Sequence, residues 1–168
     1  MVGSYMDEQA FVSLFRDHLQ DVSKYLVRRV SANQVEDLAS DIFEIAWRKR
    51  ADCPEGFELP WLYRIAGYVL ANHRRKAENR SVHLSLLDSD KTSPSAETLA
   101  LDGSELSLAY QKLGSSDRQI LSLVVFDGLT ITESAIALGI TANTASQKLK
   151  RARARLAKEL IQLMSEND

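Results

Sequence analysis

Three short helical patterns joined by tight turns, within residues 116–160, constrain the fold of this chain more than any other feature. The first repeats apolar residues at helical spacing and ends near Gly128, which can adopt the left-handed conformation that closes many helices. Thr130 and Glu133 have the spacing of a capping box at the start of the second helix. Gly139 then allows a sharp turn into the third. Helix, turn and helix in this order predict a helix-turn-helix, whose second helix enters the DNA major groove.

The third helix of this stretch has an apolar stripe and a basic remainder. Ser116 is the expected cap of the first helix and Thr141 of the third. Five apolar residues share one arc of the third helix and are expected to face the core: Ala145, Leu149, Ala152, Leu156 and Leu160. Six Lys and Arg residues and no acid lie between Asn143 and Lys158. Because a solvated helix usually mixes both signs, this surface favours an anionic partner over chance clustering.

The N-terminal half predicts three more helices. Apolar residues repeat at three and four positions over 7–30, after Asp7 as cap. Asn33 and Glu36 have the spacing of a second capping box. The segment 52–59 contains Pro and Gly and predicts an exposed loop, after which Pro60 suits the first turn of another helix.

A row of acids occupies one face of the second N-terminal helix. Asp37, Asp41 and Glu44 follow one another at helical spacing. Like charges so placed cost some helix stability, which favours a basic partner. A solvated face balanced by Arg48 and Lys49 explains the pattern equally well from these residues alone.

A second basic cluster ends the third N-terminal helix, in the segment NHRRKAENR (residues 72–80). Its cations suit phosphates, and Asn72 and His73 can also reach base edges. The helix dipole favours cations at the C-terminal end of a helix, but it explains only part of so dense a cluster of basic residues.

The segment 84–104 separates two helical units. Its composition shifts to Ser, Asp, Thr and Pro, with one Lys against four acids, and such a segment buries little. We therefore expect an all-α fold of two small domains, residues 6–83 and 105–168, joined by a flexible acidic linker.

Composition excludes several classes. A formal net charge of −2 means that any DNA contact comes from local patches, and the single Cys53 argues against a disulfide framework and for a reducing, cytoplasmic setting. No stretch is long and apolar enough for a membrane helix. The three His residues lack zinc spacing and no Gly-rich phosphate loop occurs, so we expect no catalytic residue, no metal and no cofactor.

Together these segments resemble the extracytoplasmic-function sigma factors, the minimal two-domain RNA polymerase subunits of bacteria. The resemblance rests on VEDLASDIFEIAWR and PWLYRIAGYVLANHRRK in the N-terminal half, and on DRQILSLVVFDGLTITESAIALGITANTASQKLKRARARL in the C-terminal half. One departure is Ser134, where the family usually has an apolar residue. The alternative is a helix-turn-helix regulator of the response-regulator type, which would need a sensor or receiver domain, and the N-terminal half shows no alternating strand pattern for a receiver sheet.

The resemblance implies a sigma factor that binds core RNA polymerase at the clamp coiled coil and the flap, recognises promoter DNA and has an anti-sigma partner. Four residues match the motif for the clamp: Asp37, Asp41, Glu44 and Arg48. The loop 52–59 occupies the place of the loop that captures a flipped base.

The resemblance also implies two sets of DNA contacts. Seven residues correspond to the part that meets the minus-ten element: Trp61, Tyr68, Asn72, His73, Arg74, Arg75 and Lys76. Seven more correspond to the part that meets the minus-thirty-five element: Asn143, Ser146, Gln147, Lys148, Lys150, Arg151 and Arg155.

Overall fold

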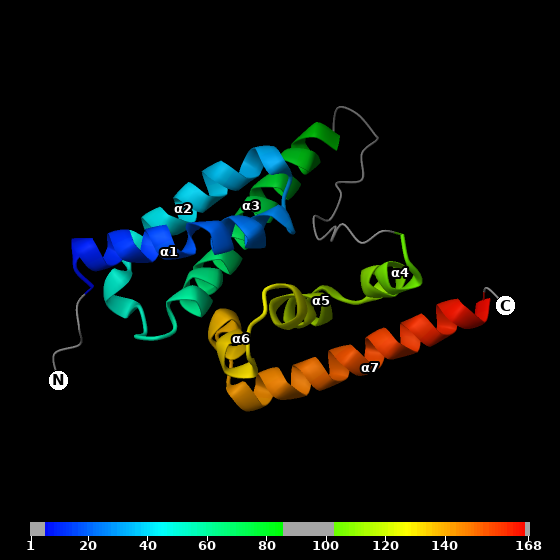
Figure 1. Cartoon of the computed structure of the whole chain (residues 1–168). Coiled ribbons are helices and arrows are strands. Elements are labelled where there is room, and N and C mark those ends of the chain that lie inside the picture. The colour runs from blue at the N-terminus through cyan, green and yellow to red at the C-terminus, as the bar shows by residue number, and fades with distance from the viewer. Residues whose placement is uncertain (1–5, 86–102, 167–168) are drawn as a thin grey trace. The chain divides into compact units, whose positions relative to one another are not determined.

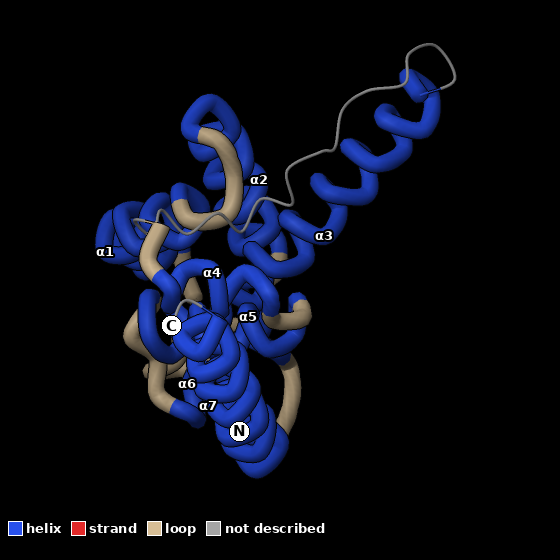
Figure 2. Tube along the Cα trace, turned by 90° about the vertical axis from the view of Figure 1, so that its right-hand side faces the viewer, coloured by secondary structure: helices blue, strands red, loops and turns tan. Residues whose placement is uncertain are grey.

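The computed structural model describes residues 6–85 and 103–166, and the regular elements in these ranges are all helical (Figures 1 and 2). The all-α fold class is therefore confirmed. No strand occurs within the described ranges, so the receiver sheet that the alternative function needs is absent from them.

The chain divides into two compact units, residues 1–98 and 99–168. The expected linker falls almost wholly on residues 86–102, outside the described part. The finer domain limits given above therefore stay a prediction, and each unit is considered by itself.

The first unit is built from α1 (Glu8–Val27), α2 (Val35–Arg48) and α3 (Glu58–Ser85), each packed against the other two (Figure 1). Asp7 caps α1 as expected, since its Oδ1 accepts a hydrogen bond of 2.8 Å from the amide of Ala10. Six apolar side chains without exposed surface form the centre of the core: Val22, Leu26, Ile42, Ala46, Leu62 and Ala66. This core holds α2 and the first half of α3 in place.

The expected capping box of Asn33 and Glu36 is wrong. Residues Ala32–Gln34 form a 3-10 turn, and α2 begins at Val35 without a side-chain cap. The hydroxyl of Ser31 lies 2.8 Å from Oδ1 of Asn33. Because this local bond engages the Asn33 side chain inside the turn, it does not cap the following helix.

The irregular part of the connection between α2 and α3, residues 53–57, is shorter than the predicted loop. A 3-10 turn, Arg50–Asp52, follows α2, and α3 already begins at Glu58. Gly56 has φ +79° and donates its amide to Oε1 of Glu58 at 2.9 Å. Burial, and then the charge of Glu58, raise the pKa of the half-buried Cys53 thiol to about 11.

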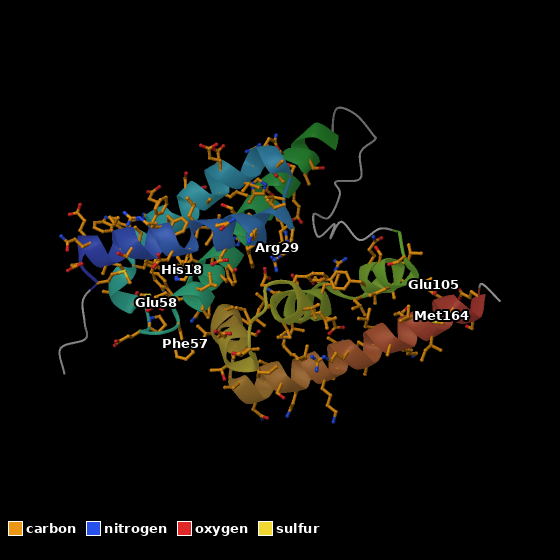
Figure 3. All side chains as sticks on the ribbon, in the orientation of Figure 1. His18, Arg29, Phe57, Glu58, Glu105 and Met164 are labelled. Atoms are coloured by element: carbon orange, nitrogen blue, oxygen red, sulfur yellow. The ribbon has the colours of Figure 1, made fainter. Side chains whose placement is uncertain are left out.

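The second unit arranges three short helices around a fourth, longer one (Figure 1). These are α4 (Glu105–Lys112), α5 (Ser115–Leu121), α6 (Ile131–Leu138) and α7 (Ala142–Glu166), and α4, α5 and α6 all pack against α7. Met164 lies near the C-terminal end of α7 (Figure 3).

The predicted caps of the helix-turn-helix are confirmed. The amide of Thr130 donates to Oε2 of Glu133 at 2.7 Å, and the amide of Glu133 donates to Oγ1 of Thr130 at 3.2 Å. Gly139 is left-handed at the end of α6, with φ +66°. Thr141 accepts a bond of 3.1 Å from the amide of Thr144 and so caps α7.

The helix before α6 differs from its prediction at its start and in its last turns, whereas Gly128 after its end is left-handed as expected, with φ +71°. The cap position of this helix is Gly114, not Ser116, and after Leu121 the chain widens into a π-helical segment, Ser122–Phe126. The widened turn keeps Leu123 in the core at 2% exposure but leaves Val125 at 61%. Val125, one of the apolar residues whose spacing predicts this helix, therefore faces outward.

Ser134, at the position where an apolar residue is usual, lies in the middle of α6 and is completely buried. Its hydroxyl has no hydrogen-bond partner. A buried polar group without a partner loses its bonds to water and gains none in exchange.

We expect Ser134→Ala to raise the free energy of unfolding of the second unit by about 1 kcal/mol, because the substitution removes an unpaired hydroxyl and little volume. Urea unfolding followed by far-ultraviolet circular dichroism measures this effect. Both tryptophans, Trp47 and Trp61, belong to the first unit, so fluorescence separates its transition from that of the second. Thr132→Ala, at an exposed position of the same helix, is the control. A destabilised Ser134→Ala would contradict the assignment.

The Cys53 thiol should react slowly with iodoacetamide at neutral pH. A pKa of about 11 instead of 9.0 leaves roughly 100-fold less thiolate, which is the reacting form. The rate measured against pH should rise until about pH 11, and the unfolded chain should titrate near its ordinary value. Glu58→Gln removes the nearby charge and should lower the pKa, though not fully, since burial is the larger cause. A folded thiol that titrates at or below 9.0 would refute this.

Candidate nucleic-acid interface

The outer face of α7 presents polar and basic side chains, as predicted. Ala145, Leu149 and Ala152 are buried against the short helices. Six of the seven expected contacts are exposed on the remaining surface of the helix, and Lys148 is half-buried: the exposed ones are Asn143, Ser146, Gln147, Lys150, Arg151 and Arg155. At about 100° per residue, Asn143 and Gln147 point almost directly away from the buried stripe, and Lys150 lies about 45° to one side of that direction.

Two of the expected contacts of α7 are bonded to the start of α5. The ammonium of Lys148 donates to the hydroxyl of Ser116 at 2.8 Å, and Nη1 of Arg155 lies 2.7 Å from Oδ2 of Asp117. Sequence reasoning missed Ser116 and Asp117 because they precede these partners by more than thirty residues. In the sequence they stand out only as polar residues at the start of a predicted helix.

A groove of about 470 Å³ lies on the opposite flank of α7. Its floor is apolar and its rim carries Lys150 and Arg153. Eight residues line it: Val124, Leu129, Thr130, Ile131, Ser146, Leu149, Lys150 and Arg153. Cations therefore border both flanks of this helix.

The acidic side chains of α2 form one exposed stripe. Asp37, Asp41, Glu44 and Arg48 are all exposed, on the side opposite the buried Leu38, Ile42 and Ala46. Glu44 and Arg48 lie 3.7 Å apart, each about two-thirds exposed. An ion pair this exposed contributes at most about 1 kcal/mol, so it does little to anchor either charge.

The first half of α3 belongs to the core and the second half extends beyond it. Trp61 is only 7% exposed and packs inside the unit, whereas the ring of Tyr68 is 59% exposed. His73 is half-buried, and residues 74–82 are exposed throughout. Figure 2 shows this end of α3 projecting past α1 and α2. The expected minus-ten residues thus divide into Trp61, which supports the helix, and six that solvent can reach.

The connection 53–57 leads directly into this helix. Phe57 and Glu58 stand at its entry (Figure 3), and the amide of Trp61 donates to the carbonyl of Phe57 at 3.1 Å. Glu58 in turn accepts from the amide of Gly56. The loop is therefore held at its second end by α3.

Within the described part of the chain, no three His, Cys, Asp or Glu side chains gather as a metal site would require. No helix among these residues combines the length and apolarity needed to cross a membrane.

Two protein families match the chain in order. Sigma-70 region 2 matches residues 14–80, and sigma-70 region 4 matches residues 104–156. These matches cover α2 and most of α3 in the first unit, and the helix-turn-helix in the second.

Several proteins are similar to this chain over most of its length. RNA polymerase sigma factor NccH of Alcaligenes xylosoxydans xylosoxydans is 28% identical over 160 residues, which are 89% of this chain and 86% of that protein. The structure of CnrH in complex with the cytosolic domain of CnrY gives a TM-score of 0.61 at 20% identity, over 93% of this chain and 90% of that one. Sigma factor RpoE of Bartonella quintana, in complex with the anti-sigma factor NepR, gives 0.59 at 21% identity, over 91% and 95%. These two structures support the fold.

ECF RNA polymerase sigma factor SigF of Caulobacter vibrioides is 30% identical over 145 residues, which are 81% of this chain and 77% of that protein. With both sigma-70 regions matched in order, this chain belongs to the extracytoplasmic-function family of RNA polymerase sigma factors.

Proposed function

We propose that this sigma factor binds core RNA polymerase and directs it to promoter DNA, where it helps to open the duplex. One observation carries the proposal: a chain of net charge −2 gathers cations on two separate exposed surfaces, the second half of α3 and the outer face of α7. Such local concentration of charge suits two contacts with one polyanion.

The carboxylate stripe of α2 is the proposed contact with the polymerase. Its four residues are exposed and carry a net negative charge. The Glu44–Arg48 ion pair is itself exposed, so a partner can still reach these charges. A basic coiled coil, such as the clamp element that the family binds, would complement it. Residues of α7 and the helices around it would contact the flap.

The second half of α3 is the proposed contact with the minus-ten element. Arg74, Arg75 and Lys76 can hold phosphates, and the exposed ring of Tyr68 offers a surface for an unstacked base, a contact that contributes about 1–3 kcal/mol. Trp61 acts indirectly, by fixing α3 from inside the unit. The loop before α3 would receive a flipped base.

The outer face of α7 is the proposed contact with the minus-thirty-five element. Gln147 and Asn143 can bond to adenine edges and Lys150 to guanine. Cations on both flanks can bind the phosphate rows beside the groove.

The work is binding and strand opening, which need no covalent chemistry by this chain. It belongs in the cytoplasm, where DNA and polymerase are found. We also propose an anti-sigma partner that covers these surfaces; the anti-sigma complex of Bartonella quintana RpoE supports this by analogy.

The function is tested by adding the purified chain to sigma-free core polymerase with fragments of genomic DNA. We expect transcripts with defined starts that core polymerase alone does not produce. Absence of such transcripts, with the chain bound to the polymerase or not, would refute the proposal.

Charge reversal of the stripe, Asp37→Lys with Asp41→Lys, should weaken binding to core polymerase by at least about tenfold, because two favourable charge contacts become repulsive. Fluorescence anisotropy of the labelled chain measures the affinity. Asp17→Lys, at an exposed position of α1, is the control for added positive charge. Equal affinity for reversed and control variants would exclude α2 as the contact.

Gln147→Ala should weaken holoenzyme binding to a recovered promoter by about 1–3 kcal/mol, the contribution of one bidentate base contact, with little effect on unrelated DNA. Gln162→Ala, an exposed residue further along the same helix, should change neither. Equal losses on both DNAs would mean that Gln147 does not read sequence.

A further inference from the structure

A notch of about 300 Å³ lies between the start of α5 and one flank of α7. Its residues come from chain segments about thirty positions apart, brought together by the packing of the two helices. The notch is lined by Gly114, Ser115, Ser116, Asp117, Lys148, Arg151 and Arg155.

The notch carries an excess of positive charge. Three cations surround it and only one carboxylate, that of Asp117. Asp117 is engaged by Arg155 at 2.7 Å, and its side chain is 12% exposed. Since this pair is mutually compensated, Lys148 and Arg151 supply the net charge of the notch.

Ser116 and Lys148 form a preorganised pair at the notch. The ammonium of Lys148 donates to the Ser116 hydroxyl oxygen at 2.8 Å, so the hydroxyl hydrogen remains available to an acceptor. Lys148 retains two further N–H donors. The two side chains therefore offer donors to the same small volume.

The position of the notch relative to the base-reading face suggests its ligand. At about 100° per residue around α7, Lys148 and Arg155 lie roughly 80–100° from Gln147, on the side away from Lys150. A helix seated in the major groove, about 12 Å wide, has its flanks against the phosphate rows. The notch thus faces the place where a phosphate would lie when the outer face of α7 meets the bases.

We propose that this notch binds one backbone phosphate of promoter DNA, with Ser116 and Lys148 as its contacts and Arg151 at its edge. Arg155 holds α5 to α7 through Asp117 and so keeps Ser116 beside Lys148. The assignment rests on the proposed promoter binding by the second unit, and it adds α5 to the elements that touch DNA.

The test uses holoenzyme and a promoter fragment recovered in the transcription experiment. Affinity is measured against salt concentration for Ser116→Asp, Lys148→Gln and the double variant. Each phosphate contact contributes about 0.9 to the slope of log affinity against log salt. Each single variant should lose about that much, and the double variant should lose no more, since both residues serve one phosphate. Ser13→Asp and Lys24→Gln, at exposed positions of α1, match the charge changes and should keep the wild-type slope.

If the notch variants give the same slopes as their controls, the notch does not bind a phosphate, and promoter binding by the second unit still stands. Losses that add in the double variant would overturn the shared phosphate. If no promoter is recovered at all, the proposed function fails first, and the notch loses its ligand with it. Circular dichroism melting of each variant separates lost contacts from lost folding.

Discussion

The packing of three short helices on one stripe of α7 is the contact on which the second unit depends. Ala145 and Ala152 have no exposed surface, and Leu149 between them is 5% exposed. Alanine at two of these positions lets neighbouring helices approach closely. In such close packing each buried methylene makes its full van der Waals contacts and so contributes fully to stability. Because this stripe fixes the rotation of α7 about its axis, it also decides which residues face solvent. The cationic outer face is therefore a consequence of the buried one.

In the first unit one helix serves two purposes along its length. The beginning of α3 supplies Leu62 and Ala66 to the core without exposed surface, and the end of the helix is exposed over residues 74–82. A helix can project in this way because its backbone bonds are internal, so the exposed turns need no tertiary partner for them. Packing at one end thus positions basic side chains at the other, and Tyr68 lies at the transition.

Local sequence rules correctly predicted the caps at both ends of α6. Thr130 with Glu133 and the left-handed Gly139 were predictable because their bonds lie within one turn of helix. The same rule failed at Asn33, whose side chain was engaged by Ser31 two residues away. Helical periodicity does not account for the exposed Val125, because a π-helical turn shifts the register of the residues that follow it. Periodicity assumes a constant rotation per residue, and a widened turn breaks that assumption without a signature in composition.

By itself the sequence determined that the chain is all-α, where most helices begin, and which residues give α2 an acidic face and α3 and α7 basic ones. These properties follow from spacing along single helices. The tertiary structure alone decided which of those residues solvent reaches: it buried Trp61, exposed Tyr68, and joined Lys148 to Ser116 and Arg155 to Asp117. Contacts between residues more than thirty positions apart depend on how helices pack in space, and no local period encodes them.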